Sequence, residues 1–374
     1  MADANEKSRI TARSAGRFLL VAGILLMICS CRNNPSSPSS SPLSFVYRDA
    51  YPWPLSTPAA QGYDTTKIAA ALQEMRNTSF LWSFLVVRND SLILEYYSTY
   101  QKENDFDIHS AAKSFTSALV GIAIDKGIIK SVQDKILSFF PDYDTTGIDP
   151  RKRDWTIEQF LTMRSGFDWD EAADHSSLYT DNVNWIYTSL GLPLKYAPGE
   201  RFVYATPNVN LLSGIITRAS GMSTYQFAEK YLFTPLRISV RSWVQDPQGV
   251  FTGGAGMSFT PRDLARLGQL YLHNGVCDGV QVVSRQWVQQ TLIPRNQTNT
   301  TWGDLPSVNY GYLWWNNYQP PDSIFMAAGF AGQFVFVVPS KNMVIVTIGN
   351  DNYPIDQASA NETVIIGIAK KYFF

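Results

Sequence analysis

Runs of apolar residues near the two ends of the chain predict β-hairpins. The segment 83–100 has two strand-like runs on either side of Asn89-Asp90-Ser91, a sequence typical of a tight turn. The segment 334–348 has two more apolar runs, and Ser340-Lys341-Asn342 lies between them. Each end of the chain is therefore expected to supply a pair of antiparallel strands.

Apolar residues at helical spacing predict longer helices between and beyond these hairpins. Gly127 is placed to end the first helix, because glycine readily adopts the left-handed conformation that follows a helix. Thr260 is followed by Pro261 and Asp263, residues typical of a helix start. The expected helices cover 110–126, 208–220, 260–274 and 355–372.

Strands at both ends with helices between them predict an α/β (α+β) fold. An antiparallel sheet, flanked by helices, would be formed by 45–130 and 251–374. The region 131–250 reads as helix and loop, rich in Trp, Tyr and Pro, and is expected to form an inserted, mostly helical lobe. The sequence contains no internal repeat.

The first residues read as an export signal. Four basic residues between Lys7 and Arg17 precede the apolar run 18–28, which is short for a membrane span but typical of a signal peptide. The run ends in Ile28-Cys29-Ser30-Cys31, which resembles a bacterial lipobox, and 33–42 is almost wholly Asn, Ser and Pro. An ordinary signal peptide and a short buried helix are the alternatives.

We therefore expect residues 1–31 to be a lipoprotein signal, 32–44 a flexible tether and 45–374 the folded domain. Cys31 would carry the lipid and hold an exported protein on a membrane of the bacterial envelope, on its periplasmic side. The membrane would be contacted only through this anchor.

Composition narrows the possible functions. Of the 374 residues 45% are hydrophobic and 17% charged, and the net charge of −1 gives no reason to expect nucleic acid as a partner. Cys277 is the single cysteine outside the export region, so a disulfide framework in the mature chain is excluded, and Cys277 is expected to be a small buried or half-buried residue. No metal-ligand spacing is present, and no cofactor is expected.

Ser110-Ala-Ala-Lys113 is the one S-x-x-K in the sequence, and it lies at the start of a predicted helix. Residues three apart share a helix face, so the Lys113 amine can reach the Ser110 hydroxyl. The positive end of the helix and burial would disfavour the charged amine and lower its pKa. The alternative is a capping serine beside a solvated lysine. His109 is expected to face away from Ser110, and His175 and His273 have no visible partner.

Three further segments follow in order. Residues 155–166 form a helix and turn, Pro198–Thr206 places Tyr204 just before the helix at 208, and Gly329-Phe330-Ala331-Gly332-Gln333 is a glycine-rich turn beside the last hairpin. With S-x-x-K, these segments resemble the superfamily of class C β-lactamases and penicillin-binding esterases. The resemblance runs from about Leu81 to the C-terminus and is closest in character to the 6-aminohexanoate-dimer hydrolases and family VIII-type esterases.

The resemblance implies a role for each motif residue. Ser110 would be the acylated nucleophile, Lys113 would share its proton, and Tyr204 would relay protons to the leaving group. Gly329 and Phe330 would occupy the third motif, where the backbone N–H groups of Phe330 and Ser110 form the oxyanion hole.

The sequence departs from the family pattern at two positions. The third residue of the tyrosine motif is Thr206 rather than Asn, and the third motif reads Ala327-Ala328-Gly329, without its usual cation. That cation helps to hold the substrate carboxylate in β-lactamases and transpeptidases, so its absence argues against efficient recognition of β-lactams or D-Ala-D-Ala.

The expected function is therefore hydrolysis of a small to medium ester or amide through an acyl-enzyme. The alternatives are a true β-lactamase or D-Ala-D-Ala carboxypeptidase, and a catalytically silent envelope lipoprotein that only binds. The sequence leaves the natural substrate and the oligomeric state open.

Overall fold

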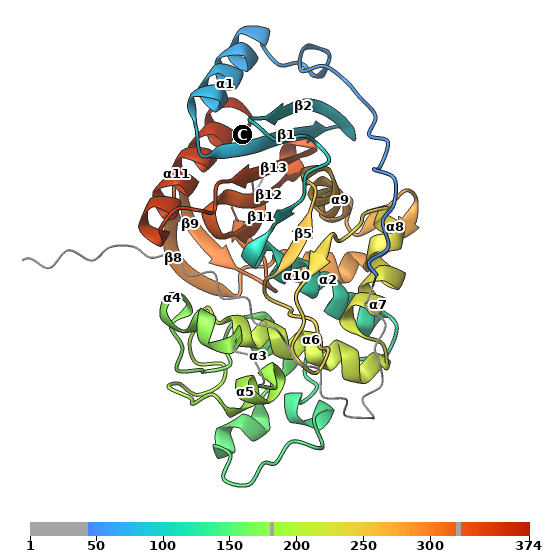
Figure 1. Ribbon diagram of the computed structural model, residues 1–374, viewed down its shortest axis with the longest axis vertical. Helices are drawn as coiled ribbons and strands as arrows, with labels where there is room; N and C mark the ends of the chain where they lie inside the picture. Colours follow the sequence, from blue (N-terminus) through green and yellow to red (C-terminus); the bar gives the residue numbers. More distant parts are fainter. Residues whose placement is uncertain (1–43, 180–182, 319–322) are drawn as a thin grey trace, which may run out of the picture. The chain divides into compact units, whose positions relative to one another are not determined.

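A computed structural model describes residues 44–179, 183–318 and 323–374, and these fall in one compact unit, Ser44–Phe374 (Figure 1). Its centre is an eight-stranded antiparallel sheet with the order β2-β1-β13-β12-β11-β10-β9-β8. The strands are β1 (Leu81–Arg88), β2 (Ser91–Tyr97), β8 (Asn296–Trp302), β9 (Leu305–Tyr310), β10 (Trp315–Asn317), β11 (Ile324–Gly329), β12 (Gln333–Val338) and β13 (Met343–Gly349).

The first and last hairpins share this sheet, as the sequence predicts. Strand β1 pairs directly with β13, with Phe84 opposite Thr347. The turn between β1 and β2 is made by Asn89 and Asp90, both with positive φ (47° and 59°), as a two-residue hairpin turn requires. The expected fold class, an antiparallel sheet built from both chain ends and flanked by helices, is confirmed.

Strands β8 to β11 were not predicted from the sequence. Strand β8 is the last strand of the sheet order, and its sequence NQTNTTW is mostly polar. An edge strand pairs on one side only, and polar side chains are usual there, so its hydrophobic alternation is weak. A pattern of apolar runs therefore does not indicate strand β8.

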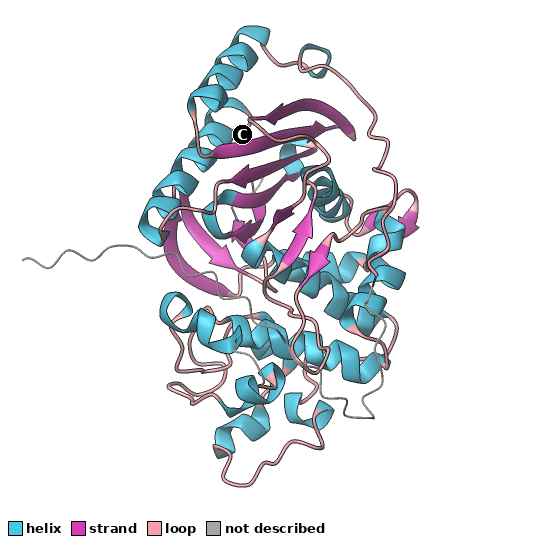
Figure 2. Cartoon of the chain, in the orientation of Figure 1, coloured by secondary structure: helices cyan, strands magenta, loops and turns pink. Residues whose placement is uncertain are grey.

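Helices cover both faces of the sheet (Figures 1 and 2). Alternate residues of β1 belong to different cores: Leu85 packs in the core shared with α2 (Ala112–Asp125) and α9 (Pro261–Leu272), and Phe84 in the core shared with α1 (Thr65–Asn77) and α11 (Ile355–Tyr372). Helix α9 lies so close to the sheet that a Cβ on Gly268 would be 2.4 Å from Val344 Cγ1. The period-two alternation of the strands thus sorts their side chains between two helical layers.

The region between the sheet-forming ends is mainly helical, and Figure 2 shows it below the sheet. Helix α6 begins after an extended Ala205 and ends at Ser220, where Gly221, with φ of 70°, caps it. Of the short sheet β3-β5-β4, strand β4 lies within residues 131–250, and β3 and β5 lie outside that range. The division into two lobes stays a prediction. The helices of this region are α3 (Ile157–Leu161), α4 (Glu171–Asp174), α5 (Trp185–Gly191), α6 (Thr206–Ser220), α7 (Thr224–Ala228) and α8 (Thr234–Leu236). The strands of the short sheet are β3 (Phe106–Asp107), β4 (Ser242–Trp243) and β5 (Met257–Phe259).

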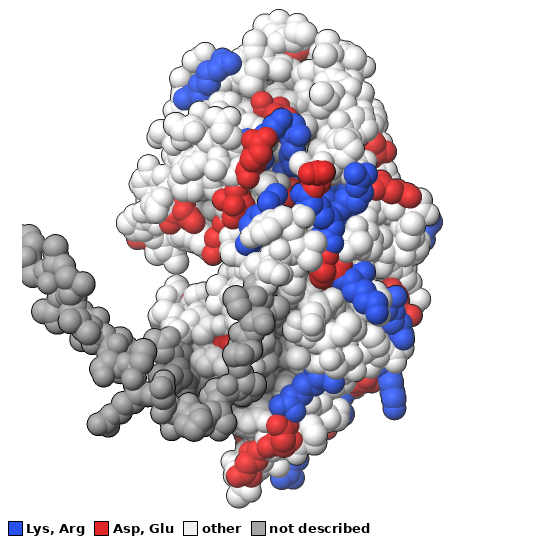
Figure 3. Space-filling view, turned by 45° about the vertical axis from the view of Figure 1, so that its right-hand side comes forward, with Lys and Arg blue, Asp and Glu red and all other residues white. Residues whose placement is uncertain are grey.

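Two smaller elements follow α9 in the sequence: the hairpin of β6 (Val276–Cys277) and β7 (Val280–Gln281), and helix α10 (Arg285–Leu292). Cys277 is buried, as expected, and its sulfur accepts a hydrogen bond from Arg266 (2.8 Å). None of the helices in the described ranges is long and apolar enough to cross a membrane. On the face seen in Figure 3, basic side chains lie beside acidic ones.

Candidate active site

Ser110 lies in a short 3₁₀ turn, His109–Ala111, that leads directly into α2. The sequence predicts the helix from Ser110, but its regular part begins two residues later. His109 has a φ of 47°, and its N–H donates to Asp107 Oδ1 (2.8 Å). The serine is half-buried, so its hydroxyl is held at the N-terminal edge of a buried helix.

Lys113 lies one helical turn further on and is almost completely buried, with 1% of its surface exposed. Its Nζ lies 2.8 Å from Ser110 Oγ and 2.9 Å from the Gly254 carbonyl oxygen. Burial lowers the pKa of Lys113 to about 8, although the negative charge of Glu171 works in the opposite direction. The alternative of a solvated lysine therefore does not hold.

Tyr204 comes from the loop before α6, far from Ser110 in sequence, and its phenol interacts with the Ser110 side chain, which acts to lower the phenol pKa. Lys113 Nζ lies 4.9 Å from the centre of the Tyr204 ring. Burial and the charge of Glu171 raise the pKa of Tyr204 and outweigh the effect of Ser110. The fold thus brings Ser110, Lys113 and Tyr204 together, with the tyrosine as a neutral phenol near neutral pH.

The third predicted segment also reaches Ser110. Gly329 ends β11, and a Cβ at this position would lie 2.2 Å from the Ile108 carbonyl oxygen and 3.2 Å from the Ala111 nitrogen. Only glycine permits this approach. The next residue, Phe330, packs its ring edge-to-face on His109, with 5.7 Å between ring centres. The expected place of residues 329 and 330 beside the nucleophile agrees with this packing, while the oxyanion role of the Phe330 N–H stays a prediction.

His109 is tied to a different partner. Its Nε2 lies 2.9 Å from Asp351 Oδ2, just after β13. Burial works to lower the pKa of His109, but its interactions with Asp351 and Asp107 outweigh burial and raise it. His109 therefore links the turn that carries Ser110 to the end of the sheet.

Glu171 is a site residue that sequence reasoning missed. Its Oε2 accepts the Thr206 N–H (2.9 Å) and the Trp169 Nε1–H (2.8 Å), while Oε1 accepts the Thr206 hydroxyl and lies 3.2 Å from His175 Nδ1. Burial opposes ionisation, but the hydrogen bonds from His175 and Thr206 and the charge of Lys113 lower the pKa of Glu171 to about 2. Thr206, the third residue of the tyrosine motif, thus binds the Glu171 carboxylate. No sequence motif indicated Glu171.

Two glycines were also missed. Gly254 supplies the carbonyl that Lys113 contacts, and the N–H groups of Gly253 and Gly254 donate to Asn210 Oδ1 on α6 (3.0 and 3.3 Å). A Cβ on Gly253 would lie 2.1 Å from the Val209 carbonyl oxygen. The run Gly253-Gly254-Ala255-Gly256 is the sequence signal that could have indicated a close backbone approach.

The two residues that depart from the family pattern, Thr206 and Ala327, are buried. Thr206 is fully buried against Glu171, and Ala327 is fully buried in the core beneath β11. At these positions the described structure offers neither an amide nor a cation to a substrate. Among the described residues, no group of three or more His, Cys, Asp or Glu could hold a metal ion.

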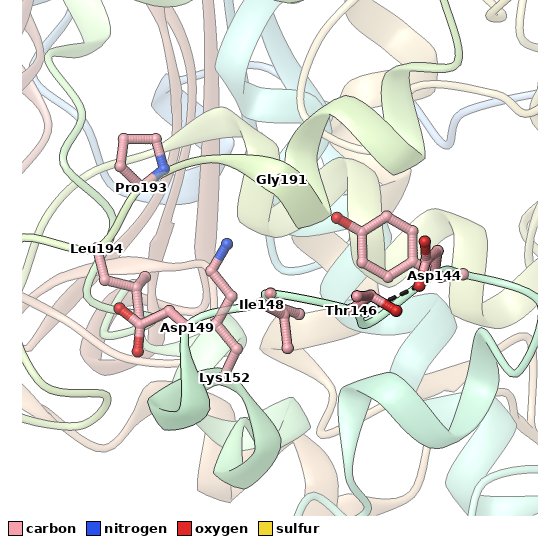
Figure 4. Close-up of a pocket in the computed structure, with 10 residues that line it drawn as sticks. Asp144, Thr146, Ile148, Asp149, Lys152, Gly191, Pro193 and Leu194 are labelled. Atoms are coloured by element: carbon pink, nitrogen blue, oxygen red, sulfur yellow. Dashed lines mark hydrogen bonds between the residues drawn. The ribbon is translucent and has the colours of Figure 1, made fainter.

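Figure 4 shows a separate cavity of about 410 Å³, lined by residues from 143–152 and 191–194. Lys152 lies on its wall, and its Nζ donates to the carbonyl oxygens of Leu190 (2.8 Å) and Leu192 (2.6 Å). Its cation is therefore engaged by the protein, and none of Ser110, Lys113 and Tyr204 lines this cavity.

Comparison with known protein families shows the family to which this chain belongs. The model of a family described as beta-lactamase matches residues 82–370, which is most of the chain. The chain belongs to the β-lactamase family. Its S-x-x-K, tyrosine and glycine segments all lie within the matched range, so the resemblance inferred from these motifs is confirmed.

Individual members of the β-lactamase family are distant from this chain. A 6-aminohexanoate-dimer hydrolase from Paenarthrobacter ureafaciens is 25% identical over 288 residues, which cover 72% of each protein. A beta-lactamase from Escherichia coli K12 is 24% identical over 312 residues, 67% of this chain and 76% of that protein. The fold is similar to that of an octameric penicillin-binding protein homologue from Pyrococcus abyssi, with a TM-score of 0.60 and 18% identity over 82% of this chain and 79% of that one.

The buried lysine makes a testable prediction about stability. Because its pKa is about 8 in the fold and 10.5 for an unperturbed lysine, protonated Lys113 destabilises the folded state below pH 8. This cost disappears as the pH rises from 8 to 10.5. At about 1.4 kcal/mol per pKa unit, wild type should gain on the order of 3 kcal/mol in free energy of unfolding relative to Lys113→Met over this range.

Urea denaturation at pH 7 and pH 10.5 measures this difference. Lys102→Met, at a lysine whose side chain is 52% exposed, is the matched control and should differ from wild type equally at both pH values. A Lys113→Met difference that is also independent of pH would contradict the lowered pKa.

Proposed function

We propose that this protein is a serine hydrolase that cleaves an ester or amide bond through an acyl-enzyme on Ser110. The observation that carries the proposal is the 2.8 Å contact between Ser110 Oγ and a fully buried Lys113 amine whose pKa is lowered to about 8 by burial. The two acceptors around this amine, the Ser110 hydroxyl and the Gly254 carbonyl, are both uncharged. Such an environment favours the neutral amine, which is the form that can take a proton.

In the acylation step, Ser110 Oγ attacks the carbonyl carbon of the substrate as its proton passes to Lys113 Nζ. The carbonyl oxygen becomes an oxyanion, which the backbone N–H groups of Ser110 and Phe330 stabilise. The packing of Gly329 against Ile108 and Ala111 supports this pairing, because it holds the two segments in contact.

Collapse of the tetrahedral intermediate requires a proton on the leaving group. Tyr204 is the group suited to this step, because burial and Glu171 raise its pKa and keep it a phenol. The tyrosine then recovers the proton from Lys113 through the Ser110 position. Water releases the acyl group by the same steps in reverse order.

The substrate is proposed to be neutral and partly apolar. Ala327 replaces the motif residue that supplies a cation, and it is buried. Aromatic rings border Tyr204: Trp315 stacks on it with 5.7 Å between ring centres, and Phe202 lies at 6.4 Å. One relative is a 6-aminohexanoate-dimer hydrolase and another a beta-lactamase, so amide and β-lactam substrates belong in the same test.

Ser110→Ala should reduce hydrolysis of a short-chain nitrophenyl ester by at least about 10³-fold, because the nucleophile is removed. Ser114→Ala is the matched control, since Ser114 lies on α2 just after the turn that carries Ser110 and its hydroxyl donates to the Leu313 carbonyl (2.8 Å). This control should keep its activity. Initial rates with the ester measure the activity of each variant, and initial rates with a chromogenic cephalosporin measure the substrate preference of the wild type.

The wild type should prefer the ester. Wild-type-like turnover by folded Ser110→Ala protein would contradict the mechanism, while faster hydrolysis of the cephalosporin than of the ester would favour the β-lactamase alternative. Folded wild type without activity on any ester, amide or β-lactam tested would favour the silent binding protein.

We also propose that Cys31 carries a lipid that anchors the exported protein, on the evidence of its basic leader, short apolar run and Ser/Pro-rich tether. Cys29, Cys31 and residues 32–43 of the tether lie outside the described residues. Cys31→Ser should move the protein from the membrane fraction to the soluble fraction. A Cys31→Ser protein that stays with membranes and retains residues 18–28 would show instead that the apolar segment is the anchor.

A further inference from the structure

A carboxyl group from the last helix reaches the turn that follows Phe330. Glu362 on α11 is 8% exposed. Its Oε1 accepts the backbone N–H of Ala331 (2.8 Å), and its Oε2 accepts the Trp302 Nε1–H (3.0 Å). The N–H of Gly332 also interacts with this carboxyl group. One buried side chain therefore connects α11, β8 and the turn between β11 and β12.

The turn has a conformation that needs such support. Ala331 has a φ of 63°, in the left-handed region that residues with a side chain rarely adopt, and Gly332 has a φ of 93°. On the other side, the Thr347 hydroxyl donates to the Gly332 carbonyl (2.7 Å). A Cβ on Gly349 would lie 1.9 Å from the Ala331 carbonyl oxygen, so β13 presses directly against the turn.

The position of this turn determines where the Phe330 backbone points. Gly329 is fixed against the segment that carries Ser110, with its missing Cβ 2.2 Å from the Ile108 carbonyl oxygen. Ala331 is fixed by Glu362. Phe330 lies between these two fixed residues, so a shift of Ala331 would rotate the peptide unit that carries the Phe330 N–H.

We propose that Glu362 is a positioning residue that holds the turn between β11 and β12, and through it the Phe330 N–H, in the orientation needed for acyl transfer at Ser110. This assignment rests on the proposed serine hydrolase function. Glu362 acts through the turn and does not contact the substrate.

The chemistry of the three partners explains why the residue is a carboxylate. All three groups that face Glu362 are N–H donors, and a carboxylate accepts with both oxygens, whereas an amide would turn its own NH₂ group toward one of them. Burial raises the pKa of Glu362 to about 7, so the chain carries a carboxyl group here at a cost to stability. Its charge also acts on Tyr204, where burial, Glu171 and Glu362 all raise the phenol pKa.

Glu362→Gln is the first test, because it keeps the size of the side chain and removes one acceptor. We expect kcat for the nitrophenyl ester to fall about 10- to 100-fold, as displaced oxyanion donors do, with KM within about twofold of wild type. Titration of active sites with a fluorophosphonate gives kcat per functional molecule, so a smaller folded fraction does not imitate the effect.

Asp263→Asn is the matched control. Asp263 on α9 is also a buried carboxyl group, 6% exposed, and burial raises its pKa to about 6, but its carboxyl group interacts with Thr260 and the Ser239 backbone, away from the turn that follows Phe330. It should lower the melting temperature without changing kcat per active site. If Glu362→Gln does not fold, Trp302→Phe serves instead, because it keeps a ring and removes the N–H that holds Oε2. It should lower kcat in the same direction by a smaller factor.

The outcomes separate the two proposals. Active wild type with an unchanged kcat in the folded Glu362→Gln protein, or in Trp302→Phe when the first variant does not fold, would overturn the role of Glu362 alone. An equal fall of kcat in Asp263→Asn would also overturn it, since the effect would then be general destabilisation. Wild type without ester or amide hydrolysis would overturn the proposed function and this assignment with it.

Discussion

The burial of the Lys113 amine beside the Ser110 hydroxyl is the constraint on which the rest of the site depends. In water a lysine at this spacing would stay charged and inert. Here α2 runs through the core, and the neutral Gly254 carbonyl is the second acceptor of the amine. The approach of that carbonyl requires glycine at 253 and 254, where side chains would collide with α6. Packing of the whole molecule therefore sets the protonation of one amine.

Two carboxyl groups near Tyr204 are shifted in opposite directions by their surroundings. Glu171 accepts hydrogen bonds from Thr206 and His175 and feels the charge of Lys113, and its pKa falls to about 2. Glu362 is buried among backbone and indole N–H groups, and its pKa rises to about 7. Both act on Tyr204 in the same sense, because each raises the pKa of the phenol. A lysine whose pKa is lowered is suited to accept the Ser110 proton, and a tyrosine whose pKa is raised is suited to carry a proton to the leaving group afterwards.

The sequence predicted the features that depend on neighbouring residues. Helix pitch alone relates Ser110 to Lys113, and the helix expected over 355–372 has those bounds in the structure. Tyr204 and Gly329 were placed only through the family resemblance, because no local pattern brings them to Ser110. Glu171 and Glu362 could not be predicted, since their importance comes from tertiary contacts with Thr206, Ala331 and Trp302. The polar edge strand β8 was missed because its alternation is weak.

Intact mass spectrometry after exposure to a fluorophosphonate tests whether Ser110 Oγ is the atom that becomes acylated. The reagent forms a stable bond with a serine that is activated by a neighbouring base and an oxyanion hole. We expect one adduct per chain, mapped to the peptide that contains Ser110. No adduct on a protein that still hydrolyses the ester, or an adduct mapped to another residue, would contradict it.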